Sequence, residues 1–194
     1  TTYWVEARAS VSSPIMITEF SSNPDDIEIQ NVSGKSFDAT GWQVIICDGS
    51  NINTPVTQTW TLGTFSPYEI KMNGDSYNFP VNLAFSNDDW IMIIDDKGNI
   101  KDFVASDYTA TEIQNMNVSA GGFTGLNPVN ENEWTGAGVA STSAFVIRQF
   151  YDVNDATDWT SAPTGSFNQP NPNMIPNPAF SASACPSPRV PLKI

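Results

Sequence analysis

The chain contains no histidine, the side chain that most often serves as a general base near neutral pH and the commonest zinc ligand. Its two cysteines are too few for a disulfide framework in 194 residues. Only 8 residues are lysine or arginine against 21 aspartates and glutamates, so the formal net charge is −13. A phosphate backbone repels a protein of this charge. We therefore expect no nucleic-acid partner.

Long apolar runs and nucleophile motifs are missing as well. Runs such as 44–47 and 91–94 are far shorter than the ~18 residues that a membrane helix requires, which predicts no membrane insertion. Neither a Gly-x-Ser-x-Gly motif nor a glycine-rich phosphate loop occurs. Together with the lack of histidine, these absences predict that the chain is not an enzyme and carries no cofactor.

What the sequence does contain is apolar residues that recur at spacing two, the pattern of β-strands. Segments 14–20 and 27–31 are predicted to form one hairpin, and segments 88–94 and 100–104 a second hairpin across the turn 95–99. Further strands are expected at 42–47, 57–62, 68–72 and 144–148. The predicted fold class is all-β.

Two segments depart from this alternation. Residues 105–138 are rich in Asn, Gly and Thr, which predicts a long loop region with one short helical turn at 111–116. Residues 169–184 are rich in Pro and Asn, which is typical of an extended linker.

Four motifs between residues 14 and 168 resemble, in order, those of the lamin tail domain family, found in animal lamins and in secreted bacterial proteins. They are Ile-Met-Ile-Thr-Glu-Phe at 15–20 with Asp-Ile-Glu-Ile-Gln-Asn at 26–31, Phe-Asp-Ala-Thr-Gly-Trp at 37–42, the hairpin from 87 to 104, and Ile147-Arg148 with the Asp-rich ending at 152–168. The resemblance implies an immunoglobulin-like β-sandwich over residues 14–168.

The two ends of the chain resemble the last two strands of immunoglobulin-like repeats in Bacteroidetes-type surface proteins. The resemblance implies that 1–10 and 185–194 are a partial immunoglobulin-like strand pair, an additional two-stranded terminal ribbon into which the sandwich is inserted. Its paired faces would hold alternating residues, namely Tyr3, Val5, Val190, Leu192 and Ile194. We expect assembly by strand addition with flanking immunoglobulin-like domains or other copies. In the resembled repeats the second cysteine pairs with one in an earlier strand that this chain lacks. Cys47 would then be a buried apolar residue and Cys185 an orphan.

Two further groups are candidate binding sites. Asp152, Asn154, Asp155 and Asp158 offer hard oxygen ligands at close spacing, as a calcium loop does. They lack the glycine and the closing glutamate of an EF-hand, and the same residues suit turns without any metal. Trp134 is the tryptophan expected to be exposed, and it is a candidate for stacking on glycans, whereas the other tryptophans of the sandwich are expected in the core.

The predicted function is a non-catalytic extracellular module, structural or adhesive, of a larger cell-surface or filament-forming protein. The alternative is a glycan-binding accessory domain of a secreted bacterial hydrolase. Nuclear scaffold binding, as in animal lamins, conflicts with the charge of −13.

Overall fold

The computed structural model describes residues 13–22, 25–49, 51–56, 59–73, 88–149, 152–171 and 174. The expected ribbon of 1–10 and 185–194, with Tyr3, Val5, Val190, Leu192 and Ile194, lies outside the described residues, and so does Cys185. None of the helices in the described part has the length and apolar character needed to cross a membrane.

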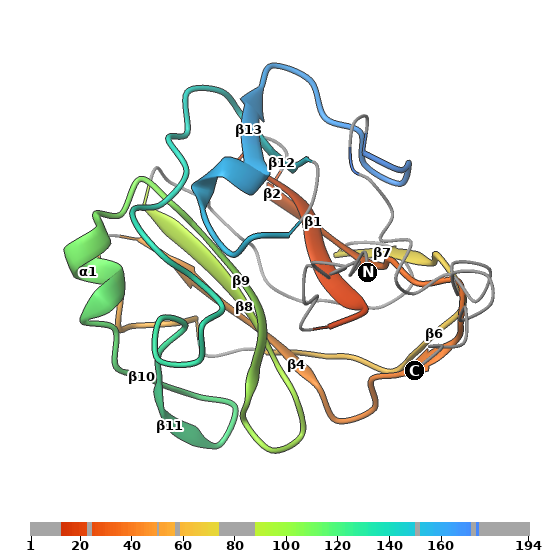
Figure 1. Ribbon diagram of the computed structural model, residues 1–194, viewed down its shortest axis with the longest axis horizontal. Coiled ribbons are helices and arrows are strands. Elements are labelled where there is room, and N and C mark those ends of the chain that lie inside the picture. The colour runs from red at the N-terminus through yellow and green to blue at the C-terminus, as the bar shows by residue number, and fades with distance from the viewer. Residues whose placement is uncertain are drawn as a thin grey trace, which may run out of the picture.

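The described chain is an all-β sandwich, as predicted (Figure 1). The larger sheet has the strand order β13-β12-β1-β2-β7 and the second sheet the order β5-β4-β8-β9, and all pairings in both are antiparallel. Two small ribbons, β3 with β6 and β10 with β11, complete the strands. The bounds of the elements are β1 Ile15–Ser22, β2 Asp25–Asn31, β3 Phe37–Asp38, β4 Gln43–Asp48, β5 Trp60–Thr61, β6 Thr64–Phe65, β7 Ile70–Met72, β8 Asp89–Ile94, β9 Ile100–Ser106, α1 Ala110–Gln114, β10 Val118–Ala120, β11 Phe123–Leu126, β12 Phe145–Arg148, a 3₁₀ helix Ala156–Asp158 and β13 Trp159–Ala162.

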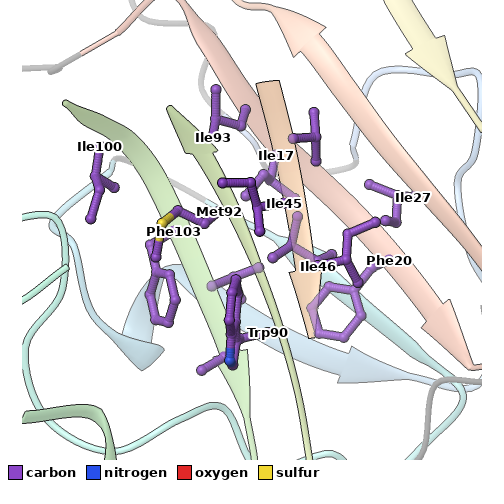
Figure 2. Close-up of a cluster of buried hydrophobic side chains, with 14 of the residues drawn as sticks. Ile17, Phe20, Ile27, Ile45, Ile46, Trp90, Met92, Ile93, Ile100 and Phe103 are labelled. Atoms are coloured by element: carbon purple, nitrogen blue, oxygen red, sulfur yellow. The ribbon is translucent and has the colours of Figure 1, made fainter. Parts of the chain in front are cut away.

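The core lies between the two sheets. Because successive side chains of a strand point to opposite faces of its sheet, every second side chain points into this space. Ile17 and Ile27 of the larger sheet and Ile46 and Ile93 of the second sheet are completely buried. Figure 2 shows these side chains gathered with Phe20 between the strands. Burying an isoleucine side chain contributes about 1.5–3 kcal/mol to the stability of the fold, so the packing of these side chains between the sheets is the main stabilising interaction of the sandwich. Both predicted hairpins, β1 with β2 and β8 with β9, are confirmed.

The outer face of the second sheet is also apolar, and the chain after β9 covers it. Met92 and Phe103 are paired in register and point away from the larger sheet, because their neighbours Ile93 and Asp102 point towards it. Phe103 contacts Trp134 edge to face, at 5.5 Å between ring centroids. The segment predicted as a long loop therefore folds back as a covering layer, with α1 close to the predicted helical turn and the unpredicted ribbon of β10 and β11.

The outer face of the larger sheet is covered by a second segment, residues 163–171, which we call the strap. The chain enters it from β13, drawn in blue in Figure 1. Phe167 packs on Phe145 of β12 at 5.8 Å between ring centroids. Asn171, which the sequence places in the linker, is buried and belongs to the packed domain.

Residues 144–148, which the sequence predicts as a strand, are followed by one more strand of the same sheet. β13 follows β12 and pairs with it along its whole length, from Phe145 opposite Ala162 to Arg148 opposite Trp159. The sequence of β13, Trp-Thr-Ser-Ala, has too little apolar alternation to stand out among the Asp-rich turns before it.

Candidate functional site

Among the buried charged side chains of the described part of the molecule, two clusters lie on opposite faces of the larger sheet. The inter-sheet cluster consists of Asp102, Arg148 and Asp152. The outer cluster consists of Glu19 and Glu28, covered by the strap. Because buried charges are costly unless they are paired and hydrogen-bonded, these clusters are the first places to look for function.

Arg148 stands at the centre of the inter-sheet cluster and is 1% exposed. Its Nη2 donates to Asp102 Oδ1 at 2.6 Å, and its Nη1 donates to Asp152 Oδ1 at 2.9 Å. Its Nε donates to the carbonyl oxygen of Ile17 at 2.8 Å, and its guanidinium carbon lies 4.5 Å from the ring centroid of Trp159. The guanidinium group thus joins β12 to β9 of the opposite sheet, to β1 and to the following loop.

Asp102 is placed by the hairpin turn of the second sheet and meets β1 where that strand is irregular. The pairing of β1 with β2 shifts between Ile17 and Glu19, and the pairing of β1 with β12 begins only at Glu19. Asp102 Oδ2 accepts the N–H of Ile17 at 2.6 Å, and Oδ1 accepts the N–H of Phe103 at 2.9 Å. Burial raises the pKa of Asp102, while the charge of Arg148 and the N–H of Ile17 oppose the rise. The cluster therefore supplies β1 with partners for its backbone at the irregularity.

The four predicted calcium ligands lie in one loop after β12, but most of their oxygens face protein donors. Asp152 binds Arg148, and Asp155 caps the 3₁₀ helix by accepting the N–H of Thr157 at 2.7 Å. Asp158 accepts the N–H of Val153 and of Asn154, both at 2.9 Å.

The remaining candidate ligand, Asn154, has a positive φ of 62° and a buried Oδ1 without a hydrogen-bond partner among the described residues. Among those residues no group of three or more His, Cys, Asp or Glu side chains is placed to hold a metal ion. This geometry favours the turn interpretation, and calcium binding stays a prediction.

The expectation that Trp134 is exposed is wrong. Its side chain is 2% exposed because the outward-facing rings of the second sheet, Phe103 among them, require an apolar cover. Trp134 therefore offers no face for stacking on a glycan. The expectation that Cys47 is a buried apolar residue is confirmed, and burial raises the pKa of its thiol to about 11.

The outer cluster was not singled out from the sequence. Glu19 of β1 and Glu28 of β2 are register partners and share the face opposite the core. The strap donates to both. The N–H of Ser166 lies 3.0 Å from each carboxylate oxygen of Glu19, and the N–H of Asn168 lies 2.7 Å from Glu28 Oε2.

The environment of this pair favours the protonated carboxyl group. Burial raises the pKa of Glu28 to about 7, and the charge of Glu19 adds to the rise, whereas bonds from Thr18 and Asn168 oppose it. Burial also raises the pKa of Glu19, against the bonds from Ser166. Neither carboxylate has a cationic partner within the described residues.

A signal for both clusters existed in the sequence. Asp102, Arg148, Asp152, Glu19 and Glu28 all fall within the motifs that carry the family resemblance, and Glu19 interrupts an otherwise mostly apolar strand. Comparison with known proteins does not add to this signal, since no family model and no curated protein matches the chain.

Proposed function

We propose that this chain is a non-catalytic extracellular module, structural or adhesive, of a larger surface or filament-forming protein, built on a sandwich of the lamin-tail type. The observation that carries the proposal is the use of Arg148. All three of its side-chain nitrogens tie strands and a loop together, and its guanidinium group is buried. These contacts of Arg148 hold the two sheets together.

Three further features support this proposal. The sequence lacks histidine, so a general base would have to be a carboxylate or another side chain. The described acidic groups with strongly shifted pKa values are engaged by strands, turns or the strap. The alternative of a glycan-binding accessory domain loses Trp134, its candidate aromatic residue for stacking, because that ring is buried.

Assembly through the terminal segments is the part of this proposal that a direct experiment tests. We expect the full chain to form higher oligomers with rising concentration, measured by light scattering after size exclusion. Val5→Pro and Leu192→Pro should each abolish them, because proline removes an N–H from a predicted pairing strand. Ser181→Pro, in the segment that already contains prolines, is the matched control and should assemble like the unmodified chain.

The non-catalytic part has its own test. Screens for esterase, glycosidase, phosphatase and nuclease activity should show no turnover above background. Activity that follows the purified protein and disappears on one carboxylate or serine substitution would overturn it. A chain that stays monomeric at all concentrations would overturn the assembly part alone.

A further inference from the structure

The strap closes a hydrogen-bond network in which acceptors outnumber the available protons. Asn171 fixes the orientation of this network, because its Nδ2 donates to the carbonyl oxygens of Thr18 at 2.6 Å and of Arg148 at 3.1 Å. Both amide hydrogens are therefore used. The amide oxygen Oδ1, which can only accept, faces Ser166 at 2.8 Å.

The hydroxyl group of Ser166 lies between two acceptors. Its Oγ is 2.8 Å from Asn171 Oδ1 and 2.7 Å from Glu19 Oε2, and a hydroxyl group has one proton. If Glu19 is ionised, one of these two short O···O contacts has no proton between its oxygens, which is unfavourable even though Glu19 Oε2 still accepts the N–H of Ser166. If Glu19 Oε2 carries a proton, it donates to Ser166 Oγ, and the Ser166 hydroxyl donates to Asn171.

Glu28, the register partner of Glu19, offers a second position for a proton. Its Oε1 lies 2.7 Å from Thr18 Oγ1, and its Oε2 accepts the N–H of Asn168. The Thr18 hydroxyl group can donate to an ionised Oε1 or accept from a protonated one. The pair therefore has two positions for a proton, one on each carboxyl group of these register partners.

Among the described residues, no cationic side chain is paired with either carboxyl group of this pair. Asp26 lies on the same face of β2. On β7, the Nζ of Lys71 is directed to the carbonyl oxygen of Thr64 at 2.7 Å and to the ring of Phe65. Arg148 of β12 points to Asp102 and Asp152 in the inter-sheet cluster. The strap itself, residues 163–171, contains no titratable side chain.

We infer that the Glu19–Glu28 pair holds one proton while the strap is docked, so that the strap is a proton-linked latch, closed in mildly acidic solution and released as the pair loses that proton. Released, its nine residues could span up to about 30 Å as extended chain. This inference goes beyond the proposed function and does not depend on it. The raised pKa values of both carboxyl groups agree with it.

The direct test is an NMR titration of the full chain that follows the side-chain carboxyl carbons of Glu19 and Glu28. We expect one of the two, or a shared step, to titrate between about pH 6 and 8, well above the ordinary pKa of glutamate. If both titrate below pH 5, the pair holds no proton at neutral pH and the inference is wrong. This measurement needs no variant and is independent of assembly.

Hydrogen exchange tests the latch itself. Protection factors of the Ser166 and Asn168 amides should fall at least tenfold from pH 5.5 to pH 8.5, while those of β4 and β8 stay constant. In the double variant Glu19→Gln, Glu28→Gln they should be independent of pH, because each glutamine amide can donate where the proton did. Asp96→Asn, at an exposed turn, is the control and should keep the dependence. Constant protection in the unmodified chain would overturn the latch.

Discussion

The inter-sheet cluster and the outer cluster place buried carboxylates on opposite faces of the same sheet, but they compensate the charge differently. Asp102 and Asp152 share the guanidinium group of Arg148. Within the described residues, Glu19 and Glu28 have only neutral donors, which come from the strap and from Thr18. Burial favours the protonated carboxyl group in both clusters, but the charge of Arg148 opposes protonation of Asp102, whereas the charge of Glu19 adds to the rise in the pKa of Glu28.

The sharpest way to break the comparison is to remove the cation. Arg148→Met leaves Asp102 buried and unpaired, and we expect the free energy of unfolding to fall by about 3–5 kcal/mol in urea titrations at pH 7. Lys101→Met removes the partly exposed partner of Asp95 and should cost about 1 kcal/mol or less. If both variants lost the same free energy of unfolding, the inter-sheet cluster would contribute no more to stability than the partly exposed ion pair.

The outer cluster can be broken without changing any charge. A Cβ at Gly165 would collide with Glu19 Oε1 and with the ring of Phe145, so Gly165→Ala should displace the strap and destabilise the domain by about 1–3 kcal/mol. Gly63 has no atom within 4 Å of the same position, and Gly63→Ala should stay within about 0.5 kcal/mol. Thermal and urea unfolding of both variants measure the difference, and a harmless Gly165→Ala would contradict the packing of the strap.

The dependence of stability on pH sharpens the comparison further. The folded chain raises the pKa of Glu28 from 4.5 to about 7, so between these values the folded state binds more protons than the unfolded state. The contribution of Glu28 is therefore fully present below about pH 4.5 and is lost as the pH rises through 7.

We expect the free energy of unfolding to fall between pH 5 and pH 8, and to fall less in Glu28→Gln. Asp158, whose pKa burial raises to about 6, acts in the same direction in both proteins, so the difference between them isolates Glu28. Parallel pH profiles for the two proteins, measured by urea titration, would contradict this assignment.

Calcium should have the smallest effect. In the loop after β12, Asp152 is engaged by Arg148 and Asp158 by backbone N–H groups, so we expect the same melting temperature in millimolar calcium and in chelator. A calcium-dependent rise that disappears in Asp155→Asn would instead establish the calcium site that the sequence suggests.

The alternation of apolar residues was sufficient to predict the strands that face the core. Ile27 and Ile29 of β2 and the turn after Ile94 follow from spacing and turn residues alone, because a strand has a fixed period of two. The same rule could not locate β13 or the ribbon of β10 and β11, whose sequences are short and mostly polar or small.

What the sequence by itself determined is therefore the fold class, the two main hairpins and the residues between the sheets, since local spacing specifies which side chains share a face. Only the tertiary structure decided whether the outer faces of the two sheets are exposed or covered. The segment after β9 folds back on the second sheet and thereby buries its own Trp134. The strap covers Glu19 and Glu28, which lie more than 130 residues away in the chain. Whether an outward residue meets water or protein depends on which distant segment covers it, and that choice rests on packing across the whole domain rather than on any local pattern.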